Sequence, residues 1–236
     1  MPNEVLLLLM TVVLYGSVVL FYRFFNVLGL YCWTVLATIS ANIEVLILID
    51  AFGMEQTLGN ILFASTFLVT DILSEICGRK EATQAVNIGI LTSLSFIIIS
   101  QSWLLYTPNA NDWAFPHIQA IFSNTPRVML AGLIVYAIVQ RFDVWLYHRW
   151  WQWSAKISGD SRRFLWLRNN GSTLISQLLN ALLFTFGAFW GTYPLATLFS
   201  ITWASYVIFI FTSLADTPAV YAARWLKETG RVKTLL

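Results

Sequence analysis

Charged residues are scarce in this sequence. Asp, Glu, Lys and Arg make up 11% of the 236 residues, whereas hydrophobic residues make up 58%. A soluble domain usually carries about 25% charged residues. So little charge excludes an ordinary water-soluble domain and indicates a chain whose natural solvent is lipid. The formal charge of +2 is also too small to indicate a nucleic-acid-binding protein.

The motifs of several enzyme classes are absent as well. The sequence contains no GxxxxGK[ST] loop, no GxSxG elbow and no HExxH motif. Cys32 and Cys77 lie far apart inside apolar segments, and neither His117 nor His148 has a metal-binding partner at useful spacing. We therefore expect no metal, no cofactor and no enzymatic activity.

Long apolar runs dominate what is present. A span needs about 20 residues as a helix, because backbone groups in lipid must be satisfied within the segment. Seven runs qualify: 5–22, 28–50, 57–77, 83–105, 126–148, 172–190 and 195–225. The sequence predicts an all-α, polytopic membrane bundle of about seven helices, forming one domain over residues 1–236.

The first of these runs is predicted to stay in the protein rather than act as a signal peptide. Met1 to Glu4 carries no positive side chain, and the run is followed by Arg23-Phe24-Phe25-Asn26 instead of a small-residue cleavage site.

The basic residues predict the orientation. They gather at Arg23, at 79–80, between 149 and 168, and at 224–233, whereas the connections at 51–56, 106–125 and 191–194 contain no Lys or Arg. Cytoplasmic loops of membrane proteins are enriched in Lys and Arg. We therefore expect an outer N-terminus and a cytoplasmic C-terminus, with the long outer connection 106–125 capping the bundle.

Polar side chains inside the predicted spans are candidates for function, because ionisable groups at membrane depth are costly. The second span carries Asn42. In the third span, Asp71 and Glu75 are four residues apart and share a helix face. This pair suits proton binding or recognition of a donor-rich or cationic ligand. The alternative is a solvated pair of carboxylates near Arg79 and Lys80.

The fifth span is the most informative. Tyr136, Gln140 and Asp143 fall on one face, and Arg127 stands near the outer end, about 24 Å from Asp143 at helical rise. An outer cation and an inner carboxylate on one helix can mark a solute path. Alternatively, Arg127 extends toward the outer interface and Asp143 forms salt bridges at the inner end.

Two later spans carry similar stripes. Gln177 and Asn180 share a face with Thr173, and Asp216 precedes Pro218 in the last span. Amide side chains at this depth either recognise a ligand or form hydrogen bonds between helices. If the stripes converge, they line a polar cavity suited to a planar heterocycle with several N–H donors, stacked on Phe67, Trp33 or Tyr136.

Four blocks of sequence resemble one known family. They are DILSEICGRKEA at 71–82, Pro126-Arg127 with the stripe through Asp143, LWLRNNGSTL at 165–174, and Asp216-Thr217-Pro218. In this order they resemble the queuosine-precursor transporter family, also described as vitamin-uptake-transporter-like, over residues 30–227. The first helix is then an addition to a six-helix family core.

The resemblance implies uptake of 7-deazaguanine bases across the bacterial inner membrane, for the synthesis of a modified transfer-RNA nucleoside. It implies Asp71, Glu75, Arg127, Gln140, Asp143 and Gln177 as ligand or gating residues. The chain departs from the family pattern at Asn180, where many members have an acidic residue, and near Phe209, where the last helix often carries a lysine.

The expected partners are therefore a small purine-like substrate and membrane lipids, with no nucleic acid. The particular base, the driving force and a homo-oligomeric state are left open by the sequence. A substrate-binding membrane subunit of an ATPase-driven importer remains an alternative function, and a membrane enzyme acting on a lipid-soluble substrate is a more distant one.

Overall fold

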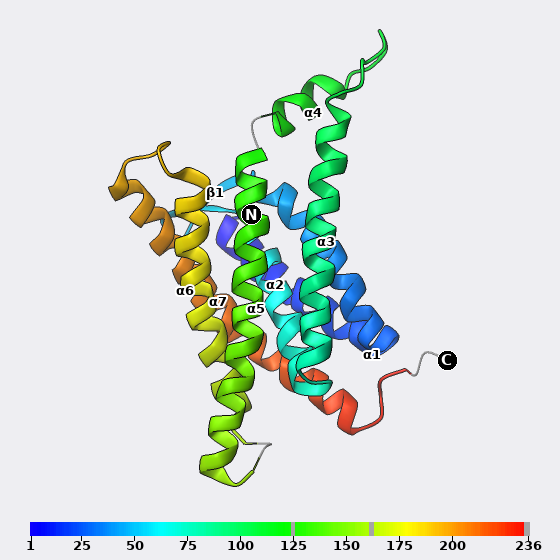
Figure 1. Cartoon of the computed structure of the whole chain (residues 1–236), viewed down its shortest axis with the longest axis vertical. Coiled ribbons are helices and arrows are strands. Elements are labelled where there is room, and N and C mark those ends of the chain that lie inside the picture. Colours follow the sequence, from blue (N-terminus) through cyan, green and yellow to red (C-terminus); the bar gives the residue numbers. More distant parts are fainter. Residues whose placement is uncertain (124–125, 161–162, 234–236) are drawn as a thin grey trace.

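The fold is a bundle of long helices (Figure 1), seen in a computed structural model that describes residues 1–123, 126–160 and 163–233. Six of its helices are long and apolar enough to cross a membrane. This confirms the predicted all-α, polytopic membrane architecture. The helices are α1 (Asn3–Glu44), α2 (Gly59–Ile76), α3 (Arg79–Trp103), α4 (Phe115–Phe122), α5 (Pro126–Ser158), α6 (Leu165–Phe189) and α7 (Leu195–Glu228).

Helix α1 is two crossings joined by a sharp break. Asn26 has non-helical torsion angles of φ 53° and ψ −142°. Beyond the break, the chain doubles back, because Asn3 Nδ2 donates to the Asp50 carbonyl at 2.9 Å and the Phe52 amide donates to Glu4 at 3.1 Å. Gly29 is required at this turn, since a Cβ there would lie 2.1 Å from the Phe21 carbonyl oxygen. The runs predicted at 5–22 and 28–50 are thus separate crossings.

A β-hairpin follows α1 where the sequence predicted helix as far as residue 50. Strands β1 (Leu48–Ala51) and β2 (Met54–Thr57) pair antiparallel, with Ala51 opposite Met54. Phe52 and Gly53 both have positive φ, at 55° and 72°. Two such residues form the tight turn that suits the twist of a hairpin. Because the apolar run continues to residue 50, no signal in the sequence marked the end of α1 at residue 44.

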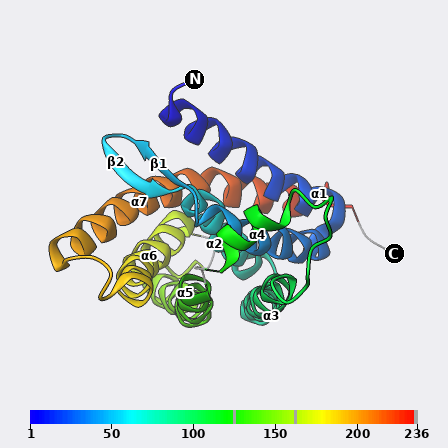
Figure 2. The same ribbon diagram turned by 90° about the horizontal axis from the view of Figure 1, so that it is seen from above.

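Helix α2 is the centre of the bundle. In its most apolar stretch of 18 residues, 89% is buried inside the bundle, compared with 28–44% for the same length of the other long helices. It contacts α1, α3, α5 and α7, and the view from above places it among them (Figure 2). Side chains on the outer faces of the surrounding helices are apolar and exposed, among them Val12, Ile98, Ile134 and Phe211, as a lipid-facing surface requires.

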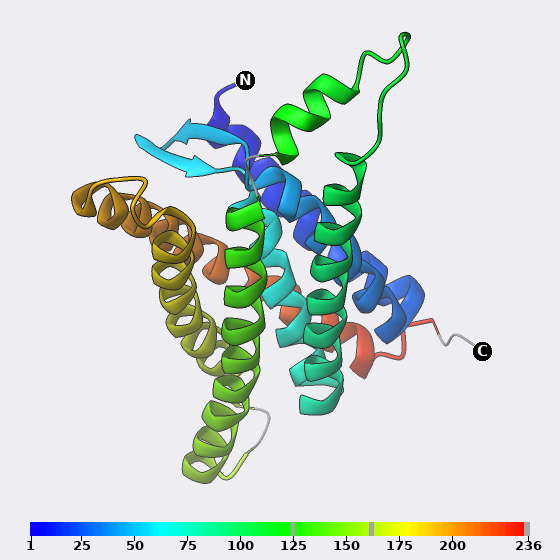
Figure 3. The same cartoon turned by 45° about the horizontal axis from the view of Figure 1, so that its top comes forward.

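The helices around the α5–α6 connection are longer than predicted. Helix α5 continues to Ser158 rather than ending at residue 148, and α6 begins at Leu165 rather than at 172. These extra turns carry Arg149, Lys156 and Arg168. The prediction followed apolar runs, so it missed helical turns that contain polar residues. At the opposite end, α4 lies beyond α5 within the predicted outer cap (Figure 3), and Gln101 Nε2 donates to the Phe122 carbonyl at 3.1 Å.

The basic segments meet at one end of the bundle. The Lys233 amide donates to the Arg23 carbonyl at 2.9 Å, and Lys227 Nζ donates to the Ile76 carbonyl, next to the α2–α3 connection. Arg162, another of the predicted basic residues, lies outside the described residues. The N-terminus and the β-hairpin lie at the other end (Figure 3). We call the two ends the basic end and the hairpin end.

Candidate functional site

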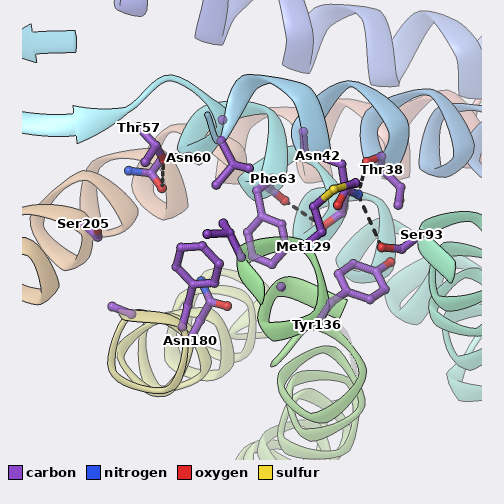
Figure 4. Close-up of a pocket in the computed structure, with 18 of the residues that line it drawn as sticks. Thr38, Asn42, Thr57, Asn60, Phe63, Ser93, Met129, Tyr136, Asn180 and Ser205 are labelled. Atoms are coloured by element: carbon purple, nitrogen blue, oxygen red, sulfur yellow. Dashed lines mark hydrogen bonds between the residues drawn. The ribbon is translucent and has the colours of Figure 1, made fainter. Parts of the chain in front are cut away.

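A pocket lies between the long helices near the hairpin end (Figure 4). Its cavity volume is about 80 Å³, and a water molecule needs roughly 10–15 Å³ measured in this way. Its walls come from α1, α2, α3, α5, α6 and α7. The lining side chains discussed below are Thr38, Asn42, Asn60, Phe63, Thr66, Ser93, Tyr136, Asn180, Phe184 and Phe209.

The pocket combines aromatic rings with uncharged polar groups. Asn42 Nδ2 donates to the Thr38 carbonyl at 2.8 Å and to Ser93 Oγ at 3.4 Å, which leaves its side-chain oxygen for other partners. Asn180 lies across the pocket from Asn42 (Figure 4). None of the described lining residues is Asp, Glu, Lys or Arg. Such a surface suits a planar, polar and largely uncharged ring system.

Tyr136 is held against a glycine of the neighbouring helix. A Cβ at Gly89 would lie 2.1 Å from the Tyr136 hydroxyl oxygen, so only glycine admits the ring in this position. The ring packs edge-on against Phe63, with centroids 6.0 Å apart. Its hydroxyl is buried beside the Thr38 hydroxyl, but it makes no hydrogen bond of regular geometry with a described residue. The fit of α3 to α5 therefore sets the position of a pocket wall.

Gln140 lies behind the lining residue Thr66, on the side of the basic end, and we call Gln140 and Phe67 the floor of the pocket although neither lines the cavity itself. Gln140 Nε2 donates to Thr66 Oγ1 at 2.7 Å, and its Oε1 accepts from Thr70 Oγ1 at 3.2 Å. Phe67 lies beside it, fully buried against Val135 and Val139. Gln140 joins α2 to α5, and this floor lies between the pocket and a second polar region.

Three carboxyl groups lie beneath the floor, and we call Asp71, Asp143 and Asp216 the acid layer. All three are at most 1% exposed, and they are close enough to repel one another when ionised. Asp71 accepts from Thr173 Oγ1 at 3.0 Å, and Asp216 accepts from Asn169 Nδ2 at 2.7 Å. None of the three forms an ion pair with a described residue.

Glu75 belongs to a different group of side chains, at the basic end of the bundle. Arg168 Nη2 lies 2.7 Å from its Oε1, Arg224 Nη1 lies 3.3 Å from the same oxygen, and Tyr147 donates to its Oε2 at 2.8 Å. The Arg168 guanidinium also lies 4.4 Å from the Trp151 ring centroid. We call these four residues, Glu75, Tyr147, Arg168 and Arg224, the Glu75 cluster. It ties α2, α5, α6 and α7 together.

The predicted site residues therefore fall into separate levels. Asn42, Tyr136 and Asn180 line the pocket, Phe67 and Gln140 form its floor, and Asp71, Asp143, Gln177 and Asp216 lie at or near the acid layer. Arg127 stands apart at the hairpin end, where its guanidinium donates to the carbonyls of Trp190 at 2.6 Å and Gly187 at 3.4 Å. In this structure it caps the C-terminus of α6.

Some pocket residues were missed by reasoning from the sequence. Asn60, Phe63 and Thr66 lie on α2 one to three turns before Asp71. They share the helix that carries the acidic motif, and this was the available signal. Trp33, offered as a stacking ring, instead donates from Nε1 to Ser65 Oγ at 3.0 Å and is not among the lining residues.

A multi-span bundle that surrounds a polar pocket, with further polar groups buried along its axis, defines a membrane protein of the solute-transport class. Residues 57–223 match the family model described as putative vitamin uptake transporter. The chain belongs to this family.

Two relatives are similar over much of their length. The chain is 37% identical over 207 residues to the probable queuosine precursor transporter of Bacillus subtilis strain 168, covering 88% of each chain. It is 29% identical over 154 residues to the queuosine precursor transporter of Escherichia coli K12, covering 64% of this chain and 63% of the relative. No solved structure matches the chain with significance.

Proposed function

We propose that this protein carries queuosine precursors, which are 7-deazaguanine bases, across the bacterial inner membrane into the cell. The observation that carries the proposal is the 37% identity to a probable queuosine precursor transporter over 88% of both chains. The pocket supports it independently, because its aromatic rings and uncharged amides suit a planar base.

The pocket is the proposed site for the base. Phe63 and Tyr136 offer ring faces and edges, and the amides of Asn42 and Asn180 face the cavity from opposite sides. A guanine-like edge presents both N–H donors and an oxo acceptor, and an amide is able to meet either. Six of the other predicted residues, Phe67, Gln140, Asp71, Asp143, Gln177 and Asp216, continue the path toward the basic end.

The proposed orientation rests on where the basic residues gather. We propose that the basic end faces the cytoplasm, by the positive-inside rule. The pocket then lies near the outer face, and the Glu75 cluster closes the inner face. Residues 1–236 act as one transport domain, and the two crossings of α1 precede most of the family-like core.

Thermal stabilisation of the purified protein tests the substrate. A ligand at 100 times its Kd stabilises the folded state by about 2.7 kcal/mol. We expect a raised melting temperature with 7-deazaguanine precursors and queuine, and none with adenine. Folded protein that responds to none of these bases would contradict the proposed substrate.

Uptake by the purified chain in liposomes tests the mode of action. We expect entry of an unmodified 7-deazaguanine without any other protein, which is transport rather than enzymatic conversion. The alternative is a substrate-binding subunit of an ATPase-driven importer. That alternative predicts binding in the melting experiment together with no uptake in liposomes.

A further inference from the structure

The polar groups beneath the pocket floor have an unusual property: the unpartnered ones all offer oxygen. Seven buried side-chain oxygens there have no hydrogen-bond partner among the described residues. They are Asp71 Oδ1, Ser74 Oγ, Asp143 Oδ1, Asp143 Oδ2, Asn169 Oδ1, Ser176 Oγ and Gln177 Oε1. The unpartnered side-chain nitrogens belong to Gln56, Asn60, His148 and Trp150, which lie elsewhere.

Buried polar groups are normally paired, so a cluster of exceptions calls for a partner. Five of the seven are carboxylate or amide oxygens, which in the ionised carboxylate and the amide only accept hydrogen bonds, whereas the two serine hydroxyls both donate and accept. A partner for the five acceptor oxygens must therefore donate. Asp143 is the clearest case, since the hydroxyl of Ser176 lies beside it but neither carboxylate oxygen is within hydrogen-bond geometry of a described group.

The missing partner must also be compatible with three carboxyl groups. Within the described ranges, both nearby cations, Arg168 and Arg224, are bound to Glu75, and neither forms an ion pair with the acid layer. Burying carboxylates without a compensating positive charge is costly. A donor that also carries positive charge satisfies both the acceptors and the carboxylates.

The acid layer is connected to the pocket through Gln140. Thr66 lines the pocket and accepts from Gln140, while Asp143 lies three residues farther along α5, or about 4.5 Å at helical rise. On α6, Gln177 likewise lies three residues from the pocket residue Asn180. A group attached to a base in the pocket has only about one helical turn to cross.

We propose that the acid layer is a second binding site, for a cationic hydrogen-bond donor, centred on Asp143. Two sources share this chemistry: the protonated amine of an aminomethyl-bearing base, and a proton carried with the base. Among the described residues, no three His, Cys, Asp or Glu side chains are arranged to hold a metal ion. This proposal rests on the proposed function.

Titratable and charged groups from several helices face this layer, and all of them bear on a pH test. They are Tyr15 of α1, Asp71 and Glu75 of α2, Asp143 and Tyr147 of α5, Arg168 of α6, and Asp216 and Arg224 of α7.

The test compares Asp143→Asn with the wild type, using two bases that differ only in their side arm: an aminomethyl and a cyano 7-deazaguanine. Asparagine keeps the shape of the side chain and removes the charge, so the variant is expected to fold. Asp112→Asn makes the same change in the connection before α4, where Asp112 accepts from the Ala114 amide at 2.7 Å, and serves as the matched control.

The two sources give different results. If the amine binds, Asp143→Asn lowers uptake of the aminomethyl base at least about tenfold, because a charged hydrogen bond is lost, and leaves the cyano base unchanged. If a proton binds, uptake of both bases falls together, and the variant loses the pH dependence that the wild type has. Asp143→Asn uptake equal to wild type for both bases, with the same pH profile, overturns the proposal.

A second readout does not depend on transport. Methylammonium chloride is expected to raise the melting temperature of the wild type above that in sodium chloride, and Asp143→Asn is expected to lose this difference. Equal protection of both proteins would overturn the acid layer as a site for an amine. A wild type that takes up neither base but is protected by methylammonium would contradict only the proposed substrate.

Discussion

At the scale of single residues, the contact between Gly89 and Tyr136 controls the shape of the pocket. We expect Gly89→Ala to displace the tyrosine ring, because the added methyl group would lie 2.1 Å from its hydroxyl oxygen. Overpacking of this kind costs about 1–3 kcal/mol. Ligand affinity, measured by thermal shift or uptake, should fall together with stability.

Gly16→Ala is the matched control for this substitution. A Cβ at Gly16 meets no atom within 4 Å, and alanine favours a helix by about 1 kcal/mol over glycine. We expect Gly16→Ala to be neutral or slightly stabilising and to bind ligand normally. If the two variants behave alike, the Gly89 contact does not shape the pocket.

The Tyr136 hydroxyl gives a second prediction at this scale. It lies beside the Thr38 hydroxyl without a hydrogen bond of regular geometry to a described residue, so Tyr136→Phe should leave the melting temperature of the unliganded protein nearly unchanged. If the hydroxyl meets the base, the variant loses one hydrogen bond to the ligand, worth about 0.5–1.5 kcal/mol. The expected result is several-fold weaker binding. Affinity equal to that of the wild type would show that the hydroxyl does not contact the ligand.

At the scale of the elements, the Glu75 cluster holds four helices together at the basic end. Arg168 is fully buried, so Glu75→Ala leaves a buried charge without its carboxylate. Breaking a buried pair in this way costs about 3–5 kcal/mol. We expect a markedly lower melting temperature. If this cluster closes the inner face as proposed, liposomes that contain the variant should also leak small solutes.

Glu228 provides the comparison, because it forms an ion pair with Arg224 within α7, near the surface. Its side chain is 46% exposed and lies 3.2 Å from Arg224. Exposed pairs are worth at most about 1 kcal/mol. Glu228→Ala should therefore have a small effect, and a Glu75→Ala variant of equal stability would rule out the inner closure.

The helices and strands also show which features of the fold are predictable from the sequence. The apolar runs predicted every membrane crossing, because hydropathy depends only on local composition. The hairpin at 48–57 was missed, since its strands of four residues lie at the end of an apolar run. Helical spacing grouped Tyr136, Gln140 and Asp143 correctly on one face, but that spacing does not report depth.

Contacts between helices were beyond such spacing. The sequence paired Asp71 with Glu75, yet the structure gives Glu75 two arginines from α6 and α7 and leaves Asp71 with the acid layer. These partners lie about 90 to 150 positions farther along the chain. Only the packing of α2 against its neighbours determines which carboxylate meets a cation.

At the scale of the whole molecule, the orientation makes a clear prediction. Cys77 joins α2 to α3 at the basic end and is exposed. In a Cys32→Ser background, a membrane-impermeant maleimide should label Cys77 in inside-out vesicles and not in intact cells. Asn111→Cys, in a variant without native cysteines, should show the reverse pattern because this residue lies in the connection between α3 and α4. Exchange of the two patterns would invert the proposed topology.

The burial of α2 has a consequence for how the protein is made. Asp71, Thr70 and Glu75 find their partners on α5, α6 and α7, all of which leave the ribosome after α2. A carboxylate facing lipid alone costs about 2.5–3.5 kcal/mol on insertion scales. The central helix of the finished bundle is therefore the crossing least able to enter the bilayer unaided, and it must be sheltered beside the insertion machinery until the second half of the chain has been synthesised.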